Sequence, residues 1–464
     1  MIFSSIPFIF FFLPFFLIIY FIVPNKFKNY ILLIFSLIFY TFGEPIYVTI
    51  LLFSSILDYS MGRLMEQYPK KKKIFLIISV VVNLALLCYF KYMNFFVTSL
   101  NTIFSSNIAI SKIILPIGIS FFTFQTMSYS IDVYKGSIKA EKNFFNFLCF
   151  VSMFPQLIAG PIVRYQDIQT EMKVKKLSFE NFSSGIVIFL NGLFKKVILA
   201  NSIGYLFDTL RMSPSLGVLS SWLIIISFAL QLYYDFSGYS EMAIGMGKMI
   251  GFTFPENFKH PYFSFSISEF FRKWHITLTS FFKDYVYIPL GGKYVSKIIN
   301  MRNILIVWLL TGLWHGANYN FILWGLFFGI VLVLEKHVFS KWLEKIPKWI
   351  RLFLTVFIVL IGWVLFAFED LSVITNMYKN LFGFNQNAFI DAEFIFYFKN
   401  YFFILIIGII FCFPLKDFKW FQKLKNYNGF VMEVSKVLIY LFLFFVTISF
   451  LVSDSYNPFL YFRF

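Results

Sequence analysis

The residues of this chain best suited to acid–base chemistry are its histidines, of which there are only four: His260, His275, His315 and His337. An imidazole has a pKa near physiological pH, so it can take a proton from a hydroxyl group and return it to a leaving group. His315 interrupts an otherwise apolar run, and an ionisable side chain at membrane depth is costly and commonly functional. His315 is therefore our first candidate for a catalytic base. A core histidine bonded to a neighbouring carbonyl is the alternative.

The other three histidines have more ordinary interpretations. His275 lies between a tryptophan and a hydroxyl-rich run, where it could act on a substrate or serve as a structural hydrogen-bond partner. His260 precedes a proline, which favours a capping or interfacial role. His337 follows a glutamate and a lysine at the expected end of a helix, which favours contact with solvent or lipid headgroups.

The usual signatures of soluble acyl-transfer and phosphate-handling enzymes are missing from the sequence. It has no G-x-S-x-G elbow, no P-loop and no H-E-x-x-H motif. Its cysteines, Cys88, Cys149 and Cys412, are far apart in apolar segments, which indicates packing residues rather than a disulfide or a metal site. Asp235 lies close to a membrane segment, where it could orient a histidine, bind a substrate or pair with an arginine such as Arg272.

The elements that must position these residues are membrane helices. Of the 464 residues, 59% are hydrophobic, and apolar runs near the roughly 20 residues needed to cross a bilayer recur along the chain. The runs are continuous rather than alternating, which argues against a β-barrel. We predict an all-α polytopic integral membrane protein that forms a single membrane domain over residues 1–464. It would have about 11–12 membrane segments, including re-entrant hairpins.

The net charge of +17 has an explanation in the membrane. Lys and Arg collect in cytoplasmic loops and face anionic lipid, and no basic stripe carries the interleaved aromatics of a nucleic-acid surface. We therefore expect the lipid bilayer as a partner, and no nucleic acid. With the basic connectors in the cytoplasm, the N- and C-termini are both extracytoplasmic. Lys195 and Lys196, inside the apolar segment 182–209, do not fit this count.

The same topology makes segment 303–335 a broken-helix hairpin, because basic connectors flank it on both sides. The sequence predicts two arms of roughly 12–17 residues, or about 18–25 Å, which is short of a crossing of about 30 Å. The break that holds His315 would then lie at mid-membrane depth or a little beyond it, inside protein or along a watery cavity. Segment 144–160 has basic flanks as well and is expected to be re-entrant. The stretch 252–300, where aromatics alternate with polar residues, should form short helices at the cytoplasmic interface, partly re-entrant.

Long parts of the sequence resemble the membrane-bound O-acyltransferase (MBOAT) family, in the bacterial branch that includes alginate O-acetylation proteins and the D-alanyl transfer protein of teichoic acids. The resemblance covers nearly the whole chain. The most specific matches are FFRKWHITLTSFFKDYVYIPLGG (270–292) and LTGLWHGANYNFILWG (310–325). Further matches are LPIGISFFTFQTMSYSIDVYKG (115–136), FPQLIAGPIVRY (154–165), LYYDFSGYSEMAIG (232–245) and the closing NPFLYFRF.

The resemblance implies that His315 is the catalytic histidine and His275 the second motif histidine. It implies membrane segments around a central pore in a bacterial cell membrane. An activated acyl donor would enter from the cytoplasm, and the acyl group would leave on the other side. In this branch an extracytoplasmic partner acetyltransferase often completes the modification of a polysaccharide.

On this basis we predict an O-acyltransferase that passes an acetyl group from a cytoplasmic thioester, acetyl-CoA or another acyl donor, toward an extracellular polysaccharide. No bound cofactor and no metal are expected. His315 would take the proton of the acceptor hydroxyl or, alternatively, carry the acyl group. His275 would position the donor or polarise its carbonyl. Gly312 and Gly316 would let the backbone approach the substrate closely.

Substrate binding is predicted for four further residues, namely Asp235, Arg272, Trp314 and Asn318. The indole N–H of Trp314 and the Asn318 amide could donate to a developing oxyanion. Arg272 could meet the phosphates of CoA or an acidic carrier protein, together with Lys273 and Lys283.

Two other functions stay open. Transfer of D-alanine from a carrier protein to teichoic acid would keep the enzyme and change the acyl group. A transporter or flippase without covalent chemistry would also use broken helices and re-entrant hairpins. The acceptor polysaccharide is open among alginate, cellulose, peptidoglycan and other exopolysaccharides.

Overall fold

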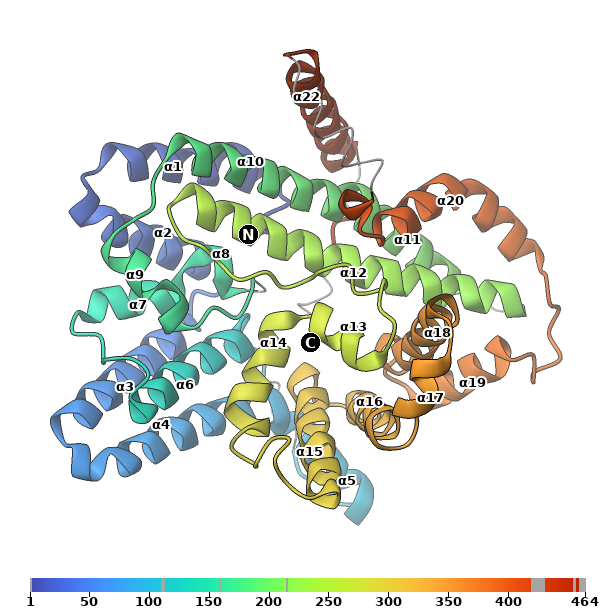
Figure 1. The fold of residues 1–464 in the computed structure, drawn as a ribbon, viewed down its shortest axis with the longest axis horizontal. Coiled ribbons are helices and arrows are strands. Elements are labelled where there is room, and N and C mark those ends of the chain that lie inside the picture. Colours follow the sequence, from blue (N-terminus) through green and yellow to red (C-terminus); the bar gives the residue numbers. More distant parts are fainter. Residues whose placement is uncertain are drawn as a thin grey trace. The chain divides into compact units, whose positions relative to one another are not determined.

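The computed structural model describes residues 2–109, 113–158, 160–213, 216–418, 430–453 and 456–458. Every regular element in these residues is helical (Figure 1). Nine of their helical segments are long and apolar enough to cross a membrane, which confirms the predicted all-α polytopic fold. The last six residues of the NPFLYFRF motif and most of the basic connector after residue 415 lie outside the described residues.

The chain divides into two compact units, each formed by two stretches of sequence. The first unit comprises Met1–Phe189 and Tyr239–Glu256, and the second comprises Leu190–Gly238 and Asn257–Phe464. Two long helices contribute residues to both units, α10 (Phe179–Phe194) and α12 (Val218–Met249). All four histidines belong to the second unit.

The other α-helices of the first unit are α1 (Leu13–Ile22), α2 (Lys28–Gly43), α3 (Val48–Gln67), α4 (Lys72–Leu87), α5 (Met93–Phe104), α6 (Ile119–Lys135), α7 (Phe144–Ser152), α8 (Phe154–Leu157) and α9 (Tyr165–Lys173). A buried polar network joins three of them. Asp58 of α3 accepts hydrogen bonds from Ser79 and Asn83 of α4 and from Ser130 of α6. A carboxyl group removed from water needs such donors, because desolvation opposes its charge.

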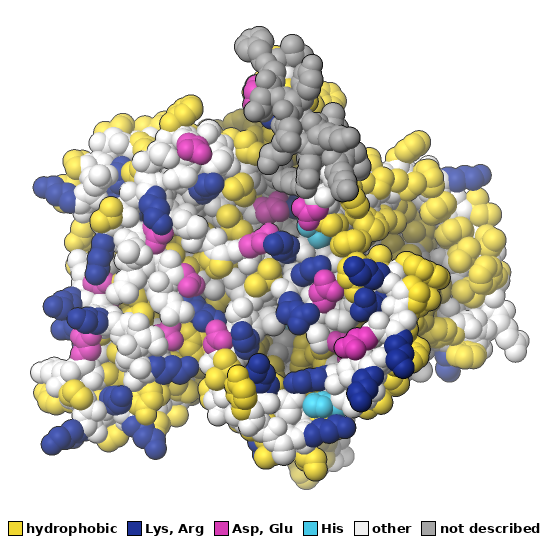
Figure 2. Space-filling model, in the orientation of Figure 1, with side chains coloured by type: hydrophobic (Ala, Val, Ile, Leu, Met, Phe, Trp, Pro, Cys, Tyr) yellow, Lys and Arg dark blue, Asp and Glu magenta, His cyan; other side chains and the backbone are white. Residues whose placement is uncertain are grey.

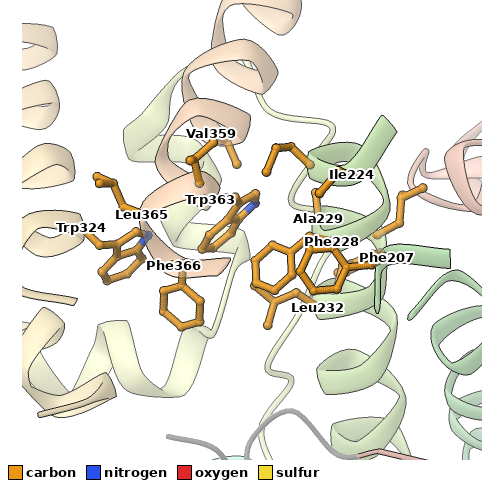
Figure 3. Packing of buried hydrophobic residues seen from close by; sticks show 14 of the residues in the cluster. Phe207, Ile224, Phe228, Ala229, Leu232, Trp324, Val359, Trp363, Leu365 and Phe366 are labelled. Carbon is orange, nitrogen blue, oxygen red and sulfur yellow. The ribbon is translucent and has the colours of Figure 1, made fainter. Parts of the chain in front are cut away.

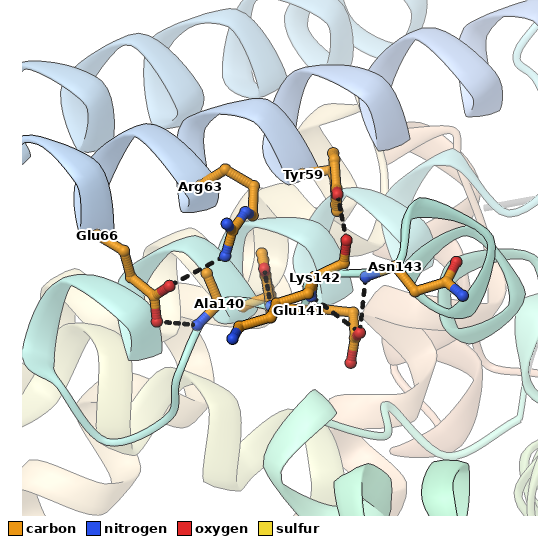
Figure 4. A network of polar contacts seen from close by, with 8 residues as sticks. Tyr59, Arg63, Glu66, Ala140, Glu141, Lys142 and Asn143 are labelled. Atoms are coloured by element: carbon orange, nitrogen blue, oxygen red, sulfur yellow. Dashed lines mark hydrogen bonds and ion pairs between the residues drawn. The ribbon is translucent and has the colours of Figure 1, made fainter.

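A second polar network fixes the connector after α6 against α3. Glu66 pairs with Arg63 at 3.1 Å and accepts a hydrogen bond from the backbone N–H of Ala140 at 2.7 Å (Figure 4). The Tyr59 hydroxyl donates to the Lys142 carbonyl at 2.7 Å. In the following segment, 144–160, α7 has nine residues and α8 has four. At about 1.5 Å per residue, neither is long enough to cross a bilayer.

Among its described residues, the second unit holds ten further α-helices, namely α11 (Asn201–Leu210), α13 (Ile267–Lys273), α14 (Ile276–Phe282), α15 (Lys297–His315), α16 (Tyr319–His337), α17 (Ser340–Lys345), α18 (Lys348–Ala367), α19 (Leu371–Leu381), α20 (Ala392–Phe411) and α22 (Phe430–Ser453). Their buried core is rich in aromatic rings, as Figure 3 shows for Phe228 of α12, Trp324 of α16, and Trp363 and Phe366 of α18. The rings of Trp324 and Trp363 stack 6.1 Å apart. Large rings remove much apolar surface from water, so this core fixes α16 and α18 against α12.

The stretch 252–300 folds as α13 and α14, followed by the π-helical turn Lys283–Tyr287. The start of α13 is anchored by Glu335 of α16, whose carboxylate accepts hydrogen bonds from the backbone N–H groups of Ile267 and Ser268 at 2.6 and 3.0 Å. A negative charge at a helix N-terminus also interacts favourably with the helix dipole.

The helices α15 and α16 form an antiparallel hairpin with 19 residues in each arm. Each arm is about 28 Å long, longer than the sequence predicted and close to a full crossing of about 30 Å. Arm length therefore does not imply a mid-membrane position for His315. The apolar run is shorter than the arms because their polar ends continue each helix beyond it.

Gly312 lies inside α15 and does not break the helix. A Cβ atom at this position would collide with the carbonyl oxygen of Phe321 in α16, and one at Gly316 would collide with the Phe321 ring. Both glycines therefore serve the close packing of the hairpin. The expected close approach of their backbone to substrate stays a prediction.

Candidate active site

His275 occupies a strained backbone position just before α14. Its φ angle is +46°, in the left-handed region that residues other than glycine rarely adopt. The backbone N–H of Ile276 donates to the carbonyl oxygen of Asn257 at 2.9 Å, and that of Thr277 donates to Asn257 Oδ1 at 3.2 Å. Strain of about 1–3 kcal/mol persists only where the surroundings fix the conformation. Asn257 supplies that fixation.

The same asparagine determines which nitrogen of His275 carries the proton. Asn257 Oδ1 accepts hydrogen bonds from the N–H and the hydroxyl of Thr277, the latter at 2.9 Å, so this atom is the oxygen of the amide. His275 Nδ1 lies 3.1 Å from the same oxygen and is therefore the donor. An imidazole protonated at Nδ1 and otherwise neutral leaves Nε2 as an acceptor.

Burial keeps His275 neutral. Its side chain is 2% exposed, and burial lowers its pKa from 6.5 to about 3. The rings of Phe236 and Trp314 lie against the imidazole, with centroids at 4.7 and 5.8 Å. A neutral side chain in a fixed tautomer can hold and orient a ligand, but it does not exchange protons near neutral pH.

His315 is the last residue of α15 and is 6% exposed. Its imidazole contacts the indole of Trp324 edge-on, with ring centroids 5.0 Å apart, and the ring of Phe366 edge-on at 5.1 Å. The residues come from α15, α16 and α18, so the packing of three helices builds this environment. The rings exclude bulk water from one side of the imidazole, which strengthens electrostatic interactions there.

Trp314 connects the two histidines. Its ring centroid lies 5.8 Å from that of His275 and 5.1 Å from that of His315, and the side chain is 4% exposed. The structure thus brings three of the predicted site residues together around one buried indole. It joins the loop before α14 to the end of α15, two positions that are distant in sequence.

Asp235 pairs with Lys196. The carboxylate lies 2.6 Å from Lys196 Nζ, and both side chains are almost fully buried. Lys196 also donates to the carbonyl oxygen of Pro458 near the C-terminus. Because a buried charge is tolerated when it is paired, this contact explains how a lysine fits inside the apolar segment 182–209. Asp235 therefore has a structural partner, besides its predicted contact with substrate.

The remaining predicted residues lie in different settings. Arg272 is exposed on α13. Its neighbour Lys273 is engaged within the fold, 2.8 Å from a carboxylate oxygen of Glu269. Asn318 caps α16, with its Oδ1 accepting a hydrogen bond from the backbone N–H of Tyr319 at 2.6 Å. Because the amide oxygen accepts this capping hydrogen bond, the NH₂ group of Asn318 is the part of the side chain that could donate a hydrogen bond to a ligand.

A cavity of about 360 Å³ lies beside the rings around His315. Phe366 belongs to both features, because it lines the cavity and its ring contacts His315. The wall is mainly aromatic and also carries charged groups; its lining includes Phe207, Arg211, Phe228, Phe321, Phe368, Glu369 and Asp370. Apolar walls with a few polar groups are typical of small-molecule sites.

The sequence also matches known proteins. The model of the family described as MBOAT, membrane-bound O-acyltransferase family, matches residues 137–368. A Pseudomonas putida protein named "Probable alginate O-acetylase AlgI" is 37% identical over 493 aligned positions that cover all of both chains. The chain belongs to the membrane-bound O-acyltransferase family.

Two further relatives of this O-acyltransferase have similar identity. A Pseudomonas syringae pv. tomato protein, also named "Probable alginate O-acetylase AlgI", is 40% identical over 83% of this chain and 76% of its own length. The "Peptidoglycan O-acetyltransferase" of Helicobacter pylori is 36% identical over 83% of this chain and 80% of its own length. With its apolar helices, the protein is a multi-pass membrane O-acyltransferase.

Three residues that contact the two histidines were not among the predicted residues of the candidate site: Asn257, Trp324 and Phe366. Asn257 is a single amide 18 positions before His275, and nothing in its sequence context indicates that contact. Trp324 lies inside the 310–325 motif, which is the one signal that could have found it. Its buried indole N–H has no hydrogen-bond partner among the described residues.

Proposed function

We propose that this O-acyltransferase transfers an acetyl group from a cytoplasmic thioester, acetyl-CoA, for the O-acetylation of an extracytoplasmic polysaccharide. The observation that carries the proposal is the packing of His275 and His315 against one buried indole, that of Trp314. The names of the relatives, alginate O-acetylase and peptidoglycan O-acetyltransferase, support acetyl as the acyl group and a polysaccharide as the acceptor.

In the proposed reaction His315 is the general base. Its imidazole takes the proton of an acceptor hydroxyl while the hydroxyl oxygen attacks the carbonyl carbon of the thioester, and a new C–O bond forms. The tetrahedral intermediate carries its negative charge on the former carbonyl oxygen. Collapse of this intermediate breaks the C–S bond, and the imidazolium returns the proton to the departing thiolate. An ester and a free thiol result.

The proposed roles of the other groups follow from their donors and acceptors. Because Nδ1 of His275 donates to Asn257, its Nε2 is the acceptor of the ring, and we assign His275 to positioning the acyl donor rather than to polarising its carbonyl. Charge on the intermediate would be stabilised by N–H donors. Trp314, Trp324 and Asn318 are the candidates.

We infer the sides from which donor and acceptor reach the site from the distribution of Lys and Arg among the connectors. The connectors rich in Lys and Arg would face the cytoplasm, which puts the ends Lys297 and His337 of the hairpin there and both chain termini outside. The lining of the cavity beside Phe366 includes Met212 and Asp370, which lie in connectors poor in Lys and Arg. We assign it to the acceptor side. A partner acetyltransferase outside the membrane would complete the transfer to polymer.

The test is acetylation in cells that lack the gene and are complemented with wild type or His315→Gln. Mild base releases ester-linked acetate from the isolated polysaccharides. The expected result is acetate with wild type and a loss of about 10²–10⁴-fold in rate with the variant, at equal amounts of protein in the membrane. His260→Asn serves as the control, because asparagine tolerates the left-handed φ of +47° at that position.

Several outcomes would contradict the proposal. Wild-type acetylation by His315→Gln would remove His315 from the reaction. Release of D-alanine instead of acetate would assign the enzyme to teichoic acid modification. Unchanged esters combined with altered export of a lipid-linked glycan would assign it to transport.

A further inference from the structure

We propose that a binding site for the headgroup of an anionic phospholipid lies where the N-terminal end of α15 meets the C-terminal end of α16. Its cationic groups are Lys297 of α15 and Lys336 of α16, with His337 beside them. Lys336 and His337 contact Asn300, a polar side chain that is 3% exposed, and Lys297 contacts the backbone of His337. The site is distinct from the histidine pair at the other end of the hairpin and does not depend on the proposed reaction.

Asn300 is oriented by its own hydrogen bonds. Its Nδ2 donates to the hydroxyl of Tyr287 at 2.7 Å and to the carbonyl oxygen of Gly292 at 2.9 Å, which fixes Oδ1 as the acceptor. Lys336 Nζ lies 2.9 Å and His337 Nε2 lies 3.0 Å from this oxygen. One buried amide therefore holds an ammonium group and an imidazole N–H next to each other.

The cluster keeps most of its positive charge. Lys297 Nζ lies 3.4 Å from the carbonyl oxygen of His337, at a helix C-terminus that offers only about half a negative charge. In the part of the chain that the structure describes, neither lysine forms an ion pair with a carboxylate. The adjacent acid, Glu335, is engaged with the start of α13. Lys and Arg are also more numerous than Asp and Glu on the face drawn in Figure 2.

Exposed apolar side chains next to the cluster favour a lipid over a soluble phosphate. Tyr294 and Ile298 are 88% and 79% exposed, and Val338, Phe339 and Trp342 are exposed as well. Lysines that reach phosphates and aromatic side chains at the same level are typical of the membrane interface. Basic sites between transmembrane helices on the cytoplasmic side bind anionic headgroups. Acyl chains would contact the apolar side chains while the phosphate meets the lysines.

The test is lipid binding by the purified full-length protein. Native mass spectrometry would compare the retention of phosphatidylglycerol and phosphatidylcholine with identical acyl chains. We expect wild type to retain phosphatidylglycerol preferentially. At about 1 kcal/mol for each basic residue near a headgroup, Lys297→Met with Lys336→Met should weaken that binding about fivefold per lysine.

Two further variants separate charge from folding. Lys336→Arg keeps the charge and should retain the lipid. Lys341→Met removes an exposed lysine of α17 outside the cluster and should leave retention unchanged. The proposal is overturned if wild type does not distinguish the two lipids, or if the double variant retains phosphatidylglycerol as wild type does. Displacement of the lipid by coenzyme A at equal concentration would assign the site to a soluble phosphate and overturn it too.

Discussion

The two histidines of the site are held in different ways. Hydrogen bonds from a loop hold His275, since Asn257 fixes both its backbone and its Nδ1 proton. Aromatic rings surround His315 at the end of a helix, with Trp324 and Phe366 as neighbours. The first arrangement fixes the orientation and the protonation of an imidazole. The second places an imidazole by the packing of three helices, which suits a group that must meet a substrate and take its proton.

Among substitutions near His275, the largest loss of stability should come from breaking the buried ion pair between Asp235 and Lys196. Asp235 precedes Phe236, whose ring lies against His275. Asp235→Asn leaves the Lys196 ammonium buried without its 2.6 Å partner, which should cost about 3–5 kcal/mol of stability. Thermal unfolding followed by fluorescence-detected size exclusion would measure the loss. Lys196→Met combined with Asp235→Leu should recover most of it. Normal stability of Asp235→Asn with lost activity would show instead that Asp235 acts on substrate.

The corresponding disruption on the His315 side is Gly312→Ala. The added Cβ would collide with the carbonyl oxygen of Phe321 and push α15 away from α16. Overpacking of this kind costs about 1–3 kcal/mol, and activity should fall because the ring contacts of His315 depend on this packing. Leu310→Ala, at an exposed position on the same helix, is the matched control. Equal melting temperatures for the two variants would refute the close-packing role of Gly312.

Substitutions of Asn257 test whether hydrogen bonds, rather than ring packing as at His315, hold His275 in place. Asn257→Ala removes the acceptor of His275 Nδ1 and of both Thr277 donors. We expect transfer rates to fall about 10–100-fold, as for other groups that orient a functional histidine. Asn257→Asp keeps the oxygen but adds a charge that favours the imidazolium, so it should raise the pKa of His275. Titration of His275 should then add to the rate a pH dependence that wild type lacks. A pH–rate profile identical to that of wild type would argue against the contact between Asn257 and His275.

The smallest effect concerns pH and stability. Burial lowers the pKa of His275 to about 3, so the unfolded chain takes up a proton before the folded protein as the pH falls. This contribution to stability is fully present above about pH 6.5 and is lost between pH 6.5 and 3, by at most about 1.4 kcal/mol per pH unit. Melting temperatures at pH 7 and 5 should differ less for His275→Gln than for wild type. An equal difference in both would place the titrating group elsewhere.

The membrane helices could be predicted from the sequence because continuous apolar runs dictate where helices can lie in a bilayer. The contact of Trp314 with both histidines could not be predicted in this way, because its distance to His275 depends on how α14 and α15 pack. The lysine inside segment 182–209 also looked anomalous until its buried partner, Asp235, was known. Hydropathy identifies apolar surface, whereas hydrogen bonds and ion pairs between distant residues decide which polar groups that surface can hold.

The most direct test of His315 as the base is the rate of acetyl transfer from acetyl-CoA to an acceptor by purified protein. His315→Gln should transfer about 10²–10⁴-fold more slowly than wild type, while His275→Gln, which loses an orienting group, should slow only about 10–100-fold. Equal thermal stability of the three proteins would exclude unfolding as the cause. Transfer by His315→Gln at the wild-type rate would contradict the assignment of the base.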